Sequence, residues 1–221
     1  MKKLLTAAVT ALCLCLISGP VYGAEDGDWQ FWQTDSVSYK ISDAWKVKLE
    51  EELWWTGDMG TLTYMHTDAG LSRKIEKWLS AGFNYRQAYS KSGDKWYAEH
   101  RPHFNLTGTV KWKGVLVKDR ARLEYRIRED AEKQDSWRFR NKTLVYFPLS
   151  FKKFKYSPYL GDEIFFTFSD KRIGRNRVYA GLKAALFKGA EIDLYYMSQS
   201  DRLKEGWKDA NVIGAKLNLT F

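Results

Sequence analysis

Cysteine is nearly absent from this chain: the 221 residues contain two, Cys13 and Cys15, and both lie in the first 23 residues. Long apolar runs are missing as well. Beyond residue 23 the longest apolar run is residues 144–149, whereas a transmembrane helix needs about 18 or more apolar residues. The remainder of the chain is therefore predicted to have no disulfide and no membrane-spanning helix.

The N-terminus has the pattern of a secretory signal. Lys2 and Lys3 precede an apolar stretch, residues 4–17, which a Ser-Gly-Pro break ends. A Val-Tyr-Gly sequence follows, with residues acceptable to signal peptidase. The stretch is short for a membrane anchor, and both cysteines follow leucine, which does not fit a lipoprotein signal. We predict a cleaved signal peptide, residues 1–23, and one secreted domain, residues 24–221.

The composition of that domain points away from nucleic acid and towards a membrane. Loss of Lys2 and Lys3 leaves 34 basic against 27 acidic residues, so the net charge falls from +9 to +7. Acidic residues are interleaved with the basic ones, and a secreted chain rarely meets nucleic acid, so we expect no nucleic-acid partner. Aromatic residues reach 16% and charged residues 29%. Both are abundant together when one strand face meets lipid and the other lines a polar interior.

Side-chain character alternates with a period of two residues along most of the chain. In residues 178–186 the even positions are apolar, and in residues 118–128 the even positions are all charged. At strand spacing such charges share one face, whereas on a helix they would scatter. The pattern predicts strands at 29–41, 45–56, 62–74, 77–90, 96–112, 115–128, 137–148, 156–168, 175–187, 190–200 and 210–221.

These strands predict an all-β fold, a transmembrane antiparallel up-and-down barrel. The predicted connections alternate between short turns and longer polar loops, as in outer-membrane barrels with periplasmic turns. The loops include residues 91–95 and 200–208, and residues 149–155 form a longer connection where a short turn is expected. The last strand alternates strictly and ends on Phe221, a terminus that the barrel assembly machinery recognises. We therefore expect a Gram-negative-type outer membrane, with lipid and lipopolysaccharide around the protein.

The number of strands is the unresolved point of this prediction. Eleven segments are found, but bacterial barrels normally have an even number of strands. Either a strand is missed or the first segment, residues 29–41, breaks near residues 33–35. We predict about twelve strands, with ten as the alternative.

Pleating assigns a basic wall to the barrel interior. The candidate binding or pore-lining residues come from neighbouring predicted strands: Glu99, Arg101, Arg120, Arg122, Glu124, Arg126, Arg138, Arg140, Lys142 and Glu163. A more acidic side includes Glu50, Glu52, Asp68, Glu191 and Asp193. Glu51 and Asp119 fall on the lipid face, where charge is costly near the midplane.

Short motifs in a fixed order give the chain a family resemblance. They are Trp32 with residues 37–43, then 49–53, 82–86, 99–101, 120–126, 137–140, 163–166 and 176–182. On these residues the chain resembles the DUF2490 family of uncharacterised outer-membrane barrel proteins. Asn84 departs from the simpler Gly-Tyr-Arg expected there. The resemblance implies a barrel and supplies no activity.

Three classes of function fit this interior. Salt bridges that fill a closed barrel would suit a structural or binding protein of the envelope, which we favour, and no enzyme activity is expected. A basic wall opposite acids would also suit a narrow, anion-preferring channel. A lipid-modifying enzyme is the third class, because His66, Asp68 and Ser72 share one face. No ligand spacing suggests a metal site, and no cofactor is expected.

Overall fold

The computed structural model describes residues 26–130, 134–147, 149–151 and 154–221, so the predicted signal peptide lies outside the described residues. Within those ranges no helix is long and apolar enough to cross a membrane. The strands are β1 (Asp28–Lys40), β2 (Trp45–Thr56), β3 (Thr61–Lys74), β4 (Leu79–Ser92), β5 (Lys95–Trp112), β6 (Val115–Arg128), β7 (Ser136–Tyr146), β8 (Leu149–Phe151), β9 (Phe154–Thr167), β10 (Arg172–Phe187), β11 (Ala190–Leu203) and β12 (Gly206–Thr220).

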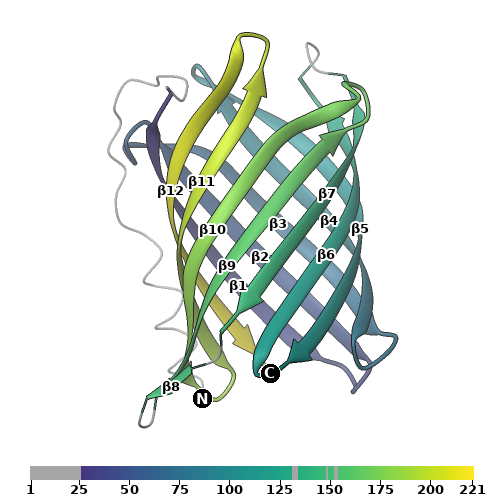
Figure 1. Ribbon diagram of the computed structural model, residues 1–221. Coiled ribbons are helices and arrows are strands. Elements are labelled where there is room, and N and C mark those ends of the chain that lie inside the picture. The colour runs from purple at the N-terminus through teal and green to yellow at the C-terminus, as the bar shows by residue number, and fades with distance from the viewer. Residues whose placement is uncertain (1–25, 131–133, 148, 152–153) are drawn as a thin grey trace, which may run out of the picture.

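Eleven of these strands close into a barrel (Figure 1). Each strand from β1 to β7 pairs with the next, β7 pairs with β9, and β9 continues through β10 and β11 to β12. The short strand β8 forms a hairpin with the start of β9 at the lower rim. The ring closes where β12 pairs with β1, and this pairing is parallel while the others are antiparallel.

The prediction of twelve strands, or ten, is wrong, because the eleven segments are the whole ring. β1 runs unbroken from Asp28 to Lys40, without the break near residues 33–35 that was one of the two alternatives. It starts beside Ala210 of β12 and remains in register to Ser38, opposite Thr220. A parallel ladder satisfies the same backbone groups as an antiparallel one, so an odd number of strands leaves no open edge.

Two of the predicted long loops are instead extensions of the strands. Ser92 of β4 pairs with Lys95 of β5, and Leu203 of β11 pairs with Gly206 of β12. Each hairpin is therefore joined by two residues. Gly93 has a φ of +58°, a left-handed conformation that glycine adopts without steric cost and that tight hairpins require. The upper rim thus consists partly of paired strand rather than flexible loop.

The period of two places charged residues inside and apolar residues outside, as predicted. The buried side chains include many polar and charged ones, and many large apolar side chains are exposed. Glu51 lies exposed on the outer face. Asp119 also faces outwards, but its carboxylate accepts hydrogen bonds from Asn141 Nδ2 at 3.0 Å and Thr143 Oγ1 at 2.8 Å. Neighbouring polar side chains on β7 therefore partly compensate that charge.

Candidate functional site

All ten predicted site residues lie on the inner face of β5, β6, β7 and β9, and we call this set the arginine wall. The seven most buried are each less than a tenth exposed: Glu99, Arg101, Arg122, Glu124, Arg138, Arg140 and Glu163. Arg120, Arg126 and Lys142 are partly buried beside them. So many cations remain together only because glutamates are placed between them.

Glu124 on β6 is the centre of the arginine wall and is 1% exposed. It forms a close ion pair with Arg138 of β7. Its other oxygen, Oε2, lies 3.5 Å from Arg140 Nη1 and 4.0 Å from Arg122 Nη1. One carboxylate therefore neutralises part of three guanidinium charges on two strands.

Glu163 on β9 performs the same role on the other side of β7. Its Oε1 accepts hydrogen bonds from Arg140 Nη2 at 2.8 Å and Arg120 Nη2 at 3.2 Å. The hydroxyl of Tyr179 donates to Oε2 at 2.8 Å, and Arg177 Nη1 lies 3.7 Å away. Arg140 thus bridges Glu124 and Glu163, so the two ion-pair clusters form one lattice along β6, β7 and β9.

Glu99 on β5 forms a further ion-pair cluster towards the upper rim. Arg101 Nε donates to its Oε1 at 2.8 Å, and Arg126 Nη2 donates to its Oε2 at 2.9 Å. Arg128 Nε lies 3.9 Å from the same Oε2. Three glutamates therefore hold a larger number of cations, and the arginine wall keeps a positive excess.

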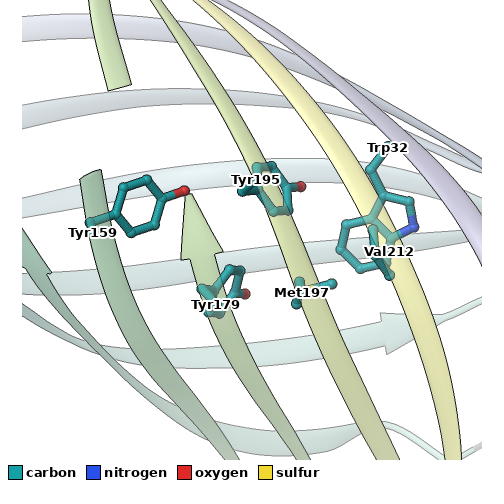
Figure 2. Packing of buried hydrophobic residues seen from close by; sticks show 6 residues of the cluster. All are labelled: Trp32, Tyr159, Tyr179, Tyr195, Met197 and Val212. Carbon is teal, nitrogen blue, oxygen red and sulfur yellow. The ribbon is translucent and has the colours of Figure 1, made fainter. Parts of the chain in front are cut away.

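Aromatic side chains cover the opposite side of the lumen, which the sequence analysis missed. Six buried residues on β9, β10, β11, β12 and β1 form this aromatic wall (Figure 2): Trp32, Tyr159, Tyr179, Tyr195, Met197 and Val212. The ring of Tyr195 lies over Gly214, where an added Cβ would stand 1.9 Å from Tyr195 Cζ. Glycines and tyrosines at inward positions of neighbouring predicted strands were the signal available in the sequence, whereas their pairing comes from the strand register.

Cation–π contacts join the two walls. The guanidinium of Arg177 lies 4.7 Å from the ring centroid of Trp32 and 4.8 Å from that of Phe165. The Lys142 ammonium lies 3.7 Å from the centroid of Tyr179. Aromatic faces attract cations, so these contacts hold surplus positive charge that no glutamate neutralises fully.

A cavity of about 260 Å³ lies between the walls. Eleven arginine or lysine side chains and three glutamates line it, together with aromatic rings such as Trp54 and Phe165. A second cavity of about 280 Å³, which we call the lower cavity, is lined by Lys46, Lys48 and Lys118. Glu50, Arg120 and Arg122 line both cavities. The larger share of cations makes the central cavity suited to negatively charged ligands.

The serine–histidine relay considered from the sequence is not assembled. Asp68 accepts hydrogen bonds from Arg86 Nε at 2.9 Å and Asn84 Nδ2 at 2.7 Å. The Ser72 hydroxyl donates to the backbone carbonyl of Lys46 at 3.3 Å. Among the described residues, neither ring nitrogen of His66 has a hydrogen-bond partner. A nucleophile needs a base within hydrogen-bond reach, and Ser72 lacks that arrangement here.

Comparison with known proteins identifies the family. The family model described as "Protein of unknown function (DUF2490)" matches residues 29–210. The chain belongs to the DUF2490 family. No curated protein sequence matches it. Among solved structures, the fold is similar to LpxR from Salmonella typhimurium, with a TM-score of 0.53 and 10% sequence identity. That likeness covers 84% of this chain and 87% of the other, and at this identity it concerns the fold of the DUF2490 protein alone.

Proposed function

We propose that this DUF2490 protein is an integral outer-membrane barrel whose lumen binds a small anion. The observation that carries the binding role is the central cavity, where cationic side chains outnumber glutamates. The membrane location rests on the outer surface. We favour binding over catalysis because Ser72 and His66 form no relay.

Exposed aromatic residues form a belt at each end of the barrel wall. Those at strand ends near the upper rim are Trp29, Trp96, Trp137, Phe168 and Trp207. Those near the lower rim are Tyr39, Trp45, Trp78, Trp112, Phe187 and Phe221. Aromatic girdles at both membrane interfaces are typical of outer-membrane barrels.

An apolar band separates the two belts. Its exposed members include Val37, Leu49, Leu71, Phe104, Leu106, Leu160, Val178, Leu194 and Ile213. Water-soluble monomers rarely expose so large a continuous apolar surface. Lipid and lipopolysaccharide are therefore the proposed surroundings of the barrel.

The C-terminus is the proposed contact with the barrel assembly machinery. The side chain of Phe221 is 64% exposed at the lower rim. Its backbone N–H donates to the carbonyl of Ser38, and its carbonyl accepts from Lys40 N–H, both at 3.0 Å. The last residue therefore extends the parallel pairing of β12 with β1, while its exposed ring can still contact a partner.

The anion-binding proposal is tested with inorganic phosphate. Tag-free protein folded in detergent is titrated by isothermal calorimetry at constant ionic strength, and saturable binding is expected. Lys142→Gln removes a cavity-lining charge and should weaken binding roughly tenfold, the effect of losing one charge-assisted bond. Lys188→Gln, at an exposed turn position, is the matched control and should bind as the unmodified protein does. Absence of saturable binding, or equal weakening by both variants, contradicts the proposal.

A narrow anion channel is the second candidate. The observation that favours it is the shared lining of the central and lower cavities by Glu50, Arg120 and Arg122. Planar-bilayer recording separates the two candidates. A channel should give a small, anion-preferring conductance whose reversal potential moves towards cations in Lys142→Glu, whereas a binding protein should bind phosphate without steady conductance.

A further inference from the structure

Two buried histidines face carboxylates at distances too long for hydrogen bonds. His66 on β3 is 3% exposed, and neither of its ring nitrogens has a hydrogen-bond partner within the described part of the chain. Its Nε2 lies 3.6 Å from Glu50 Oε1, and its Nδ1 lies 3.9 Å from Glu52 Oε1. A neutral imidazole has one N–H and one lone pair. One of these nitrogens therefore presents a lone pair to a carboxylate oxygen.

His103 on β5 also has a ring nitrogen that faces a carboxylate oxygen, and here a hydrogen bond defines the tautomer of the ring. This side chain is 1% exposed, and its Nδ1 lies 3.0 Å from the backbone carbonyl oxygen of Arg101. A carbonyl only accepts, so Nδ1 carries the hydrogen and Nε2 of the neutral ring keeps its lone pair. That Nε2 lies 3.6 Å from Asp68 Oδ2. Asp68 Oδ2 already accepts a hydrogen bond from Arg86 Nε at 2.9 Å, whereas His103 Nε2 has no hydrogen-bond partner among the described residues.

The spacing of the donor atoms matches the ligands of one metal ion. Glu50, His66 and Asp68 each offer one atom, and these three atoms lie within 4.8 Å of one another. Ligands about 2.0–2.1 Å from zinc at a tetrahedral angle stand about 3.4 Å apart. The 3.6 Å separation between His66 Nε2 and Glu50 Oε1 is close to that value. We propose that a divalent transition-metal ion such as zinc binds between Glu50, His66 and Asp68, which are its three protein ligands.

The surroundings of these residues suit such a site. His103 is outside this group of ligands, and its Nε2 lies 3.6 Å from Asp68 Oδ2. Asp68 accepts hydrogen bonds from Arg86 Nε and Asn84 Nδ2, and Glu50 pairs with Lys48. Arg86 Nη2 also lies 3.6 Å from Glu50 Oε1, so the Arg86 guanidinium orients both carboxylates. Glu50 and Asp68 both line the lower cavity, which provides a route for the ion. Glu52 adds a third negative charge next to His66.

Zinc titration of the full, folded barrel tests the proposal. Tag-free protein is stripped with a chelator and titrated with zinc by calorimetry, and bound metal is counted by mass spectrometry after dialysis. About one zinc per chain is expected, and cobalt in its place should give ligand-field absorption bands from a nitrogen and oxygen ligand set. His66→Gln should weaken zinc binding roughly tenfold or more, the scale on which metal-site substitutions act.

His100→Gln is the matched control, because His100 lies on the outer face and contacts the hydroxyl of Tyr85. It should bind zinc like the unmodified protein. Circular dichroism and heat-dependent gel migration report folding, and Glu50→Gln replaces His66→Gln if the latter does not fold. No stoichiometric zinc on the unmodified protein, or undiminished affinity in the Glu50 and His66 variants, overturns the proposal. Phosphate binding is measured separately, so each of the two proposals fails or stands alone.

Discussion

The two walls of the lumen are stabilised by different physics. The arginine wall on β5, β6, β7 and β9 consists of buried ion pairs around Glu99, Glu124 and Glu163. The aromatic wall on β9 to β12 and β1 is packed by apolar contact, and two of its rings, Tyr159 and Tyr195, lie over glycines. The stability of a buried ion pair depends on the presence of both charged partners, whereas the packing of a ring over a glycine depends on the absence of a side chain there. A substitution should therefore lower the stability of the arginine wall when it removes a charge, and that of the aromatic wall when it adds volume.

The comparison also explains the shape of the cavity. Guanidinium groups that share few carboxylates stay apart, because like charges repel, and rings on glycine-bearing strands lie flat against the wall. Tyr159 lies over Gly181 in the same way as Tyr195 lies over Gly214. The space left between the two surfaces is the central cavity of about 260 Å³. Charged side chains of the arginine wall line this cavity, and the glycines beneath the tyrosine rings leave room for it.

The largest expected effect comes from Glu124→Gln in the arginine wall. Arg138 and Arg140 lose their shared buried carboxylate, and an unpaired buried charge costs about 3–5 kcal/mol. Urea unfolding in detergent should show this loss in the free energy of unfolding. The matched control is Glu191→Gln, whose pair with Lys183 is partly exposed and should change stability by less than about 1 kcal/mol. Equal losses in both variants would remove the distinction between buried and exposed pairs.

The converse substitution, Gly214→Ala, tests the aromatic wall. The new Cβ would overlap the ring of Tyr195, and overpacking typically costs about 1–3 kcal/mol. Gly108→Ala is the control, because an added Cβ there meets no atom within 4 Å. Thermal unfolding followed by circular dichroism should show a lower midpoint for the first variant than for the second. Identical midpoints would mean that Tyr195 moves freely and that the wall is not closely packed.

Arg177→Lys sharpens the comparison at the contact between the walls. Arg177 stacks on Trp32 and donates through Nε to Gln199 Oε1 at 2.8 Å. Lysine keeps the charge but loses the planar stacking and the fork of donors, with an expected loss of about 0.5–2 kcal/mol in unfolding free energy. Arg202→Lys is the control, since it lies near Trp207 by the upper rim. A loss in the control as large as that in Arg177→Lys would show that stacking in the lumen is not special.

Phe221→Ala should have the smallest effect on stability. The backbone bonds to Ser38 and Lys40 remain, and the ring is largely exposed. Insertion into the outer membrane, followed by membrane fractionation, should nevertheless fall, because the terminal ring is the proposed signal for assembly. Phe187→Ala removes an equally exposed ring at the same rim and should insert normally. Normal insertion of the Phe221 variant would exclude the ring as that signal.

Alternation along single strands was sufficient to predict the faces of the barrel. The ten residues of the arginine wall, and His100 on the outside, follow directly from a period of two. The eleven segments were also recognisable, because each strand carries its own pattern. The prediction of an even number of strands was wrong. How the ring closes depends on pairing between the first and last strands, and no pattern within a single strand contains that information.

Contacts across the ring were decided only by the tertiary structure. Alternation specifies which face a side chain takes, but not which residue on the neighbouring strand stands opposite. The grouping of Glu50, His66 and Asp68 depends on the register of β2 against β3. The parallel pairing of β1 with β12 joins residues at opposite ends of the chain. Such contacts depend on strand register and ring closure, which only the assembled backbone hydrogen bonds establish.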